Sequence, residues 1–234
     1  MTIEVETFVA DSNLSANELA YQTIRSGILD GIHTPGSMLG EASLAQEIGV
    51  SRTPVRSALA RLQDEGWITV YPKRGALVNG LSERAIADLA DARLMLETAG
   101  VMRASTRARH ALASRLTASI GVQRKAFAAR DVRAFIESTI DFHRSFVESA
   151  ENTVLLELND RLADRQRFLL FSYGDFLLAR CAEIIAEHEQ LVGHLASDNA
   201  EEFASALHDH LAGTYGTGPS ADDAQPEADV SRRR

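Results

Sequence analysis

Residues 51–66, SRTPVRSALARLQDEG, constrain the fold of this chain more than any other stretch. Ser51 is a favourable helix N-cap, because its hydroxyl can accept a hydrogen bond from an amide of the first turn. Val55, Leu59 and Leu62 recur at helical spacing and would share one apolar face. The stretch therefore predicts a short amphipathic helix with one buried side.

The polar side of this helix carries Arg52, Thr53 and Arg56. The major groove of DNA accepts a helix, and arginine reads guanine there through two hydrogen bonds. We expect Arg52 and Arg56 to contact bases or nearby phosphates, and Ser51 and Thr53 to contact the DNA backbone. The pattern is typical of a recognition helix.

The preceding segments complete a helix-turn-helix motif. Residues 14–29 have a helical apolar stripe, and residues 41–48 (EASLAQEI) predict a second, short helix. Gly49 follows at a position where glycine commonly ends helices. Two short helices joined by a glycine turn are the signature of a helix-turn-helix.

The following segment predicts a β-hairpin. Residues 67–71 and 76–78 are typical of two strands, and the Pro-Lys-Arg-Gly sequence between them is typical of a turn. Lys73, Arg74 and Gly75 at its tip are expected to contact the flanking groove of the DNA. A hairpin after a helix-turn-helix makes a winged domain.

Proline spacing divides the chain, because Pro35, Pro54 and Pro72 are followed by none until Pro219. We therefore predict a mainly α protein: a winged helix-turn-helix domain over 14–80, an all-α helical-bundle domain over 81–215 and a disordered tail over 216–234. The second domain's predicted helices are 82–107, 111–129, 131–149, 153–171, 175–196 and 199–213.

The net charge of −9 does not exclude a DNA-binding surface. Residues 51–80 carry +3, whereas residues 81–215 carry −5. A basic patch on an acidic body attracts phosphate locally and argues against a protein that coats DNA. Cys181 is the only cysteine, so the chain forms no internal disulfide, which is typical of a cytoplasmic protein. The sequence also shows no signal peptide and no long apolar run. We therefore expect a cytoplasmic protein without a membrane partner.

Polar residues interrupt the apolar stripes of the second domain. Thr139 and His143 lie one turn apart inside the apolar arc of helix 131–149. His188 lies inside the apolar stripe of helix 175–196, and His210 lies inside that of helix 199–213. A single inward histidine is usually a hydrogen-bonded core residue. Three on separate helices suit a borderline divalent metal, although spacing alone does not show that they converge.

Arg93 is a second anomaly, because it shares a face with Leu89 and Leu96 and would point inward. It could pair with Glu97 one turn later, which is a purely structural role. It could equally bind an anion, because arginine holds carboxylates through two hydrogen bonds. Periodicity does not separate these two interpretations.

The motifs together closely resemble a known family. The first domain resembles the DNA-binding domain of GntR-family regulators at Pro35-Gly36, Leu39-x-Glu41, Leu44-Ala45, Gly49 to Arg56, Ala58-Leu59, Arg61-Leu62, Glu65-Gly66, Arg74-Gly75-Ala76 and Val78. The second resembles the FCD ligand-binding domain of the FadR subfamily at Arg93-x-x-x-Glu97, Phe142-His143-Arg144, Asn152, Glu187-His188 and His210. The resemblance covers roughly residues 15–213.

The resemblance implies a divalent metal held by one aspartate and three histidines, beside a cavity for a small carboxylate effector. The histidines carried over are His143, His188 and His210, with Zn or Ni as the metal. Thr139 stands where the family usually has aspartate, so metal binding is in doubt, and Asp141 would face solvent. Arg93 and Thr139 then become the candidate effector-binding residues.

The predicted function is a ligand-responsive transcriptional regulator and not an enzyme. We expect a homodimer that reads double-stranded operator DNA as a repressor and is released by a small organic acid. One alternative is a ligand-blind architectural regulator, which Thr139 makes credible. Another alternative is a metal-dependent hydrolase that uses His143, His188 and His210. Such an enzyme needs a general base close to the metal, and no inward Asp or Glu lies on the three apolar stripes that carry these histidines.

Overall fold

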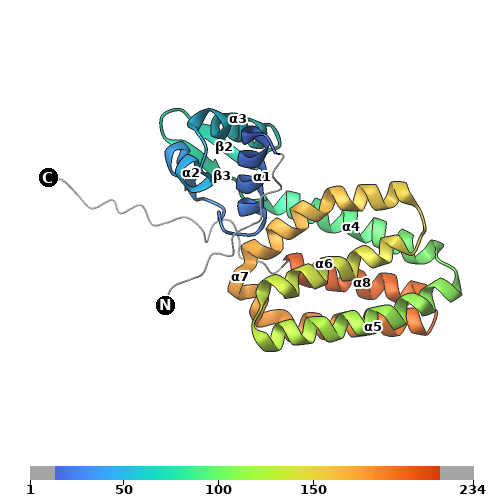
Figure 1. Ribbon diagram of the computed structural model, residues 1–234. Coiled ribbons are helices and arrows are strands. Elements are labelled where there is room, and N and C mark those ends of the chain that lie inside the picture. Colours follow the sequence, from blue (N-terminus) through green and yellow to red (C-terminus); the bar gives the residue numbers. More distant parts are fainter. Residues whose placement is uncertain (1–13, 217–234) are drawn as a thin grey trace. The chain divides into compact units, whose positions relative to one another are not determined.

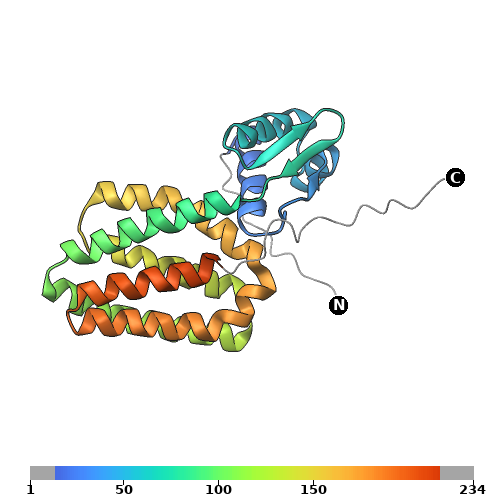
Figure 2. The same ribbon diagram turned by 180° about the vertical axis from the view of Figure 1, so that it is seen from behind.

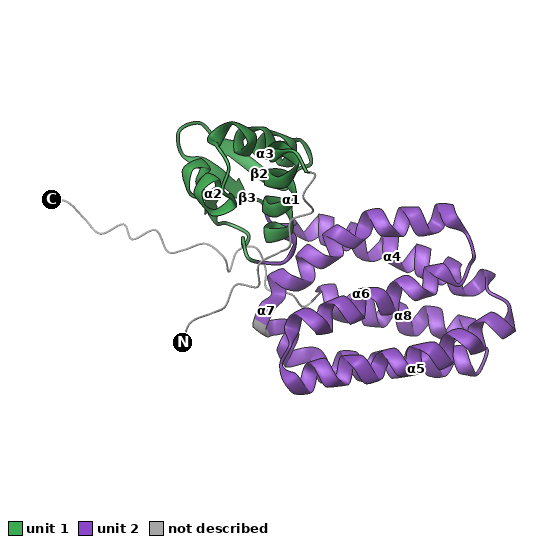
Figure 3. Cartoon of the chain, viewed as in Figure 1, with its two compact units in different colours: residues 1–28, 32–79 green, residues 29–31, 80–234 purple. Residues whose placement is uncertain are grey.

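The structure, a computed structural model, describes residues 14–216 and divides them into two compact units (Figure 3). The first comprises residues 14–28 and 32–79, and the second comprises residues 29–31 and 80–216. The predicted disordered tail, apart from Gly216, lies outside the described residues. Gly216 itself belongs to a helix.

The first unit contains three helices: α1 (Ala16–Leu29), α2 (Glu41–Ile48) and α3 (Arg52–Asp64). Helix α2 has the bounds that the sequence predicted. Gly49 ends it in the left-handed conformation, with φ 77°, and its N–H donates to the carbonyl of Ala45. Helices α2 and α3 therefore form the predicted helix-turn-helix.

A small antiparallel sheet accompanies these helices (Figure 2). Strands β2 (Ile68–Tyr71) and β3 (Gly75–Val78) form the predicted hairpin, with Tyr71 opposite Gly75. Strand β1 (Met38–Leu39) pairs with the other edge of β3, which makes the order β1-β3-β2. The sequence did not predict β1, because two residues are too few to show an alternating pattern.

The expected cap on α3 is only partly present. Ser51 lies at the N-cap with extended backbone angles, but its hydroxyl makes no capping hydrogen bond. Such a hydroxyl normally accepts from the second or third residue of the helix. The third residue here is Pro54, which has no N–H, so only the N–H of Thr53 is left as a possible donor to Ser51. The Ser51 hydroxyl thus keeps its hydrogen-bonding capacity for another partner.

The second unit consists of helices (Figure 1): α4 (Glu83–Arg103), α5 (Thr106–Ala129), α6 (Val132–Glu148), α7 (Thr153–Ala196) and α8 (Ala200–Gly216). Helices α4, α6 and α7 are capped by Ser82, Asp131 and Asn152, which each accept from an amide of the following turn. Within residues 14–216, no helix is long and apolar enough to cross a membrane.

One predicted helix boundary was wrong. The predicted gap at 108–110 is helical, and the break comes earlier, where Ser105 caps α5. The predicted break at Gly174 is confirmed, because its backbone angles (φ 45°, ψ −118°) are not helical and α7 consists of two helices that meet there at a kink. Glycine adopts these angles without a Cβ clash.

Close approach of α4 and α6 depends on Gly100. A Cβ atom added at this position would overlap the backbone carbonyl of Phe146. The two helices are thus packed with their backbones nearly in contact. One consequence is that Glu97, one turn before Gly100, reaches the side chains of α6.

Candidate functional site

The exposed face of α3 carries the predicted DNA-binding residues. Arg52, Thr53 and Arg56 are exposed, while Val55 on the same helix is fully buried. The Nε atom of Arg56 lies 2.7 Å from a carboxylate oxygen of Glu41, in a surface ion pair. Such a pair contributes little stability, so DNA phosphate can displace it. The pair links Arg56 on α3 to Glu41 on α2.

The wing presents its cations at the turn between β2 and β3. Lys73 and Arg74 are exposed, and the N–H of Arg74 donates to the carbonyl of Tyr71 across the turn. Lys73 and Gly75 both have positive φ, 66° and 112°. The backbone of the turn is therefore sharply bent, with both cationic side chains on its outside.

Arg61 belongs to the same basic stretch but is committed to structure. Its guanidinium lies 3.4 Å from the centre of the Tyr21 ring, and it pairs with Glu18 and Glu65. Tyr21 also donates its hydroxyl proton to Glu65. Arg61 thus joins α1 to α3.

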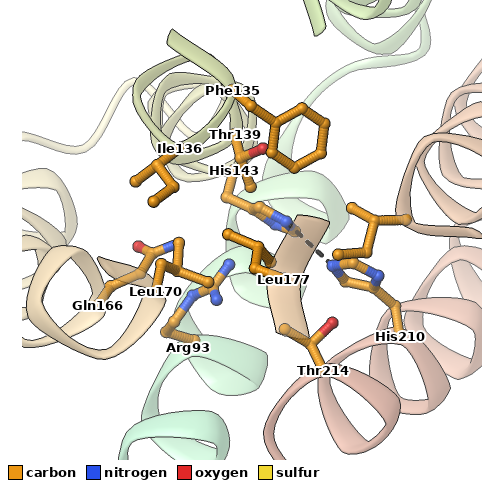
Figure 4. Close-up of a pocket in the computed structure, with 11 residues that line it drawn as sticks. Arg93, Phe135, Ile136, Thr139, His143, Gln166, Leu170, Leu177, His210 and Thr214 are labelled. Atoms are coloured by element: carbon orange, nitrogen blue, oxygen red, sulfur yellow. Dashed lines mark hydrogen bonds between the residues drawn. The ribbon is translucent and has the colours of Figure 1, made fainter. Parts of the chain in front are cut away.

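The three inward histidines of the second unit come together. His143, His188 and His210 are 2%, 0% and 3% exposed, and their ligand atoms all lie within 4.8 Å of one another. The Nε2 atoms of His143 and His210 are 3.2 Å apart (Figure 4). Three helices therefore converge on one small, dry site.

An oxygen from elsewhere in the fold lies against the Nδ1 atom of each histidine. Glu97 Oε2 is 2.7 Å from His143, and Gln123 Oε1 is 2.7 Å from His188. Glu187 Oε2 is 2.6 Å from His210. A carboxylate or amide oxygen only accepts, so each Nδ1 carries the proton and donates it. The Nε2 atoms are therefore left with free lone pairs.

This arrangement fits a divalent metal ion. The buried Nε2 of His188 has no hydrogen-bond partner. The Nε2 atoms of His143 and His210 face each other as two acceptors, which is unfavourable unless a cation lies between them. Two nitrogens held by one tetrahedral zinc are about 3.4 Å apart, close to the observed 3.2 Å. Outer oxygens that fix histidine tautomers are also characteristic of metal sites.

Electrostatics keeps two of these histidines neutral, as a metal requires. Burial lowers the pKa of His143 well below its ordinary value, and the neighbouring Arg93 and His210 lower it further. Burial is also the main reason why the pKa of His188 lies well below its ordinary value. The neighbouring His210, His143 and Arg93 lower this pKa further, in that order. Neutral imidazoles keep their lone pairs for coordination at physiological pH.

Arg93 is buried, as the sequence indicated, and it pairs with Glu97. Its Nε donates to Glu97 Oε1 over 2.9 Å, and Nη1 donates to the hydroxyl of Tyr215. Burial alone would lower the pKa of Arg93, but the Glu97 carboxylate and Tyr215 raise it. Burial raises the pKa of Glu97, and Arg93 opposes that shift. The ion pair is therefore present, and Glu97 also links Arg93 to His143.

A small cavity adjoins the histidines (Figure 4). Arg93, Thr139, His143 and His210 line it, together with Gln166, Thr214 and a set of apolar side chains from α6 and α7: Phe135, Ile136, Leu170, Leu177 and Ile184. Its free space is about that of one water molecule. The structure thus brings Arg93 and Thr139 to the same cavity as two of the histidines, while Asp141 is exposed, as expected.

The sequence missed several polar residues at this site. Gln123 continues the buried stripe Leu112, Leu116, Ile120, so the signal that revealed the histidines could have revealed it. Gln166 and Thr214 were missed as well. Glu187, which precedes His188 in the chain, holds His210 on the neighbouring helix.

Two other histidines, His33 and His194, are partly buried. Burial lowers the pKa of His33, whose ring lies against Gly27. Neither belongs to the cluster of three.

Comparison with known proteins divides the chain at the same place. The family described as "Bacterial regulatory proteins, gntR family" matches residues 16–78, and the family described as "FCD domain" matches residues 88–213. The chain is 24% identical over 214 residues to the "HTH-type transcriptional repressor RspR" of Escherichia coli, which covers 90% of this chain and 91% of that protein.

Two further proteins are similar to this chain over different shares of its length. An uncharacterized HTH-type regulator of Agrobacterium vitis is 37% identical over 95 residues, which span 40% of this chain and 56% of that protein. A putative GntR transcriptional regulator from Rhodococcus has a TM-score of 0.72 at 21% identity, over 87% of this chain and 97% of that one. This last similarity supports the fold.

Proposed function

The chain belongs to the gntR family of bacterial regulatory proteins and carries an FCD domain, and from this premise we propose that it is a repressor released from operator DNA by a small carboxylate. It is a DNA-binding transcriptional regulator and not an enzyme. The observation that carries the proposal is α3, which buries one side and exposes Arg52, Thr53 and Arg56 on the other.

In this proposal α3 enters the major groove and the wing follows the flanking backbone. Arg52 and Arg56 contact bases, while Ser51 and Thr53 contact phosphate. The unused Ser51 hydroxyl supports its role, because no capping bond competes with a phosphate contact. Lys73, Arg74 and Gly75 contact the flanking groove. As a chromosomal regulator, the protein would act in the cytoplasm.

We propose a homodimer, because two symmetric recognition helices match a pseudo-palindromic operator. Met95 and Met102 on α4 are 69% and 50% exposed, and their spacing of seven puts them on one face. Val154 and Leu158 on α7 are also exposed. Such apolar residues support self-association through the second unit. Sedimentation of the Met95→Glu/Met102→Glu variant as a monomer would support this interface, and an unchanged dimer would contradict it.

The effector site in this proposal is the cavity beside the histidines. His143, His188 and His210 would hold Zn or Ni, which would supply a positive centre for a carboxylate. Arg93 lines the same cavity and adds a second positive charge. Effector binding would change the spacing of the DNA-binding units, and coupling of this kind is typically about 1–3 kcal/mol, or 5- to 150-fold in operator affinity.

The direct test is selection of bound sequences from random duplex DNA by the full-length protein. A pseudo-palindrome with half-sites about one helical turn apart is expected. Small organic acids, each with and without Zn²⁺ or Ni²⁺, are then tested for release of that DNA. Release by none of them would favour a ligand-blind regulator, and no selected motif would overturn sequence-specific binding.

Arg52→Ala is expected to weaken binding to the selected operator by about 1–3 kcal/mol and to relax specificity at one base position. The reason is the loss of two hydrogen bonds to one base. Fluorescence anisotropy with the operator and its single-base variants measures both effects. Equal weakening on every sequence would instead make Arg52 a phosphate contact. Arg107→Ala, which removes an exposed arginine of the second unit, is the control.

Lys73→Ala and Arg74→Ala are expected to reduce the salt dependence of binding while preserving the preferred sequence. A cation that contacts phosphate releases about one counterion, so each replacement should lower the slope of log affinity against log salt by about 1. Titrations between low and moderate NaCl concentrations measure the slope. An unchanged slope would show that the wing does not contact DNA.

A further inference from the structure

The outer strand of the wing is mostly exposed. In the described part of the chain, β2 lies at the edge of the sheet, whose order is β1-β3-β2. Its first residue, Ile68, is buried, whereas the next three, up to Tyr71, are exposed. By contrast, buried and partly buried residues alternate along β3. The half of β2 that leads to Lys73 and Arg74 therefore gains little support from apolar packing.

A polar side chain of the recognition helix supports this half of β2. Gln63 lies in the last turn of α3, and its Oε1 atom accepts a hydrogen bond from the backbone N–H of Val70 over 2.8 Å. Val70 belongs to the exposed half of β2, three residues before Lys73. Because the bond is exposed to water, it contributes modestly to stability. Its main effect is geometric, since it fixes the outer edge of the wing to α3.

The base of the hairpin is closed separately by Asn79. Its side-chain nitrogen donates to the carbonyl of Gly66 over 2.9 Å, and its Oδ1 atom accepts from the hydroxyl of Thr69 over 2.9 Å. The backbone N–H of Asn79 also donates to the carbonyl of Trp67. Loss of the Gln63 hydrogen bond would therefore leave the hairpin formed but less firmly placed against α3.

We propose that Gln63 is a positioning residue for DNA binding, which holds β2 against α3 so that Lys73 and Arg74 meet phosphate while α3 lies in the groove. This inference rests on the wing contacts of the proposed function. Two-stranded hairpins are marginally stable alone, so a wing without this bond would move relative to α3. A wing tied to α3 has its cations placed in advance, and less conformational freedom is lost on binding. Gln63 thus acts through the wing and does not touch DNA itself.

The test compares the salt dependence of DNA binding by the full-length protein and by its Gln63→Leu variant. Leucine favours a helix as well as glutamine does but cannot accept the hydrogen bond from Val70. A fluorescent duplex of fixed sequence is a sufficient probe, because phosphate contacts carry no sequence information. Lys73→Ala/Arg74→Ala should lower the slope of log affinity against log salt by about 2. Gln63→Leu should lower it by about half as much, since a loosened wing keeps its charge but loses fixed contacts.

A variant with all three replacements separates positioning from direct contact. Without the wing cations Gln63 has nothing to position, so Gln63→Leu should leave the slope of the Lys73→Ala/Arg74→Ala variant unchanged. Gln22→Leu is the matched control, because Gln22 is an exposed glutamine of α1 whose side chain donates to Glu18. It should leave the slope of the unaltered protein unchanged.

Hydrogen exchange of peptides that cover β2, measured by mass spectrometry without DNA, should be faster in Gln63→Leu than in the unaltered protein. An unchanged slope for Gln63→Leu, with a lower slope for the variant without wing cations, would overturn the positioning role. An equal fall in slope with and without those cations would make Gln63 a direct DNA contact. An unchanged slope for Lys73→Ala/Arg74→Ala would overturn the wing contacts of the proposed function and this inference with them.

Discussion

Replacing Glu97 with glutamine is expected to lower the free energy of unfolding by about 3–5 kcal/mol, the usual cost of removing one partner of a buried ion pair. Glu97 is 0% exposed and accepts from Arg93 through one oxygen, while the other oxygen contacts His143. Glutamine has the same shape but leaves the Arg93 charge unbalanced in the interior. Urea unfolding followed by circular dichroism measures the loss.

Glu148→Gln is the matched control, because Glu148 pairs with Arg144 and Arg115 at the surface. Its loss should cost no more than about 1 kcal/mol. The double variant Arg93→Met/Glu97→Leu should recover part of the stability lost by Glu97→Gln, since it removes both charges together. A loss below about 1 kcal/mol for Glu97→Gln would contradict the assignment of a buried ion pair.

Zinc at 100 times its dissociation constant is expected to raise the free energy of unfolding by about 2.7 kcal/mol, because it binds the folded state alone. His188→Ala should abolish this gain. The Nε2 atom of His188 is buried without a hydrogen-bond partner, and its ring contacts both other histidines. Each variant is compared with and without zinc, so that the cost of the replacement itself cancels.

His208→Ala is the control for this experiment, because His208 lies on the same helix as His210 but is exposed. It should keep the full zinc stabilisation. Equal stabilisation of His188→Ala and the unaltered protein would show that zinc binds elsewhere. Addition of a strong chelator should return the unaltered protein to its metal-free stability.

Local patterns were sufficient for much of the fold. Helix α2 and the hairpin were predicted nearly to the residue, because capping residues, glycines and apolar spacing act over a few residues. The break at Gly174 was also predicted, and its backbone angles are not helical. The segment around His110 was interpreted as a break, yet α5 continues through it, because tertiary packing outweighs the local preference.

The inward direction of Thr139, His143, His188 and His210 was also determined by the sequence alone, since helical periodicity decides which face of a helix is buried. The same argument placed Arg93 in the interior. It could not choose between an ion pair and an anion site, because both require an inward guanidinium.

Which side chains meet depends on the packing of the helices against one another. The oxygens that orient His143, His188 and His210 lie 46, 65 and 23 residues away in the chain, on other helices. Close packing of α4 against α6 at Gly100 brings Glu97 to His143, and no local pattern records that distance. Local sequence patterns were therefore enough to predict the recognition helix and the inward histidines. Convergence of the histidines on one site was decided by helix packing, which depends on contacts between distant residues.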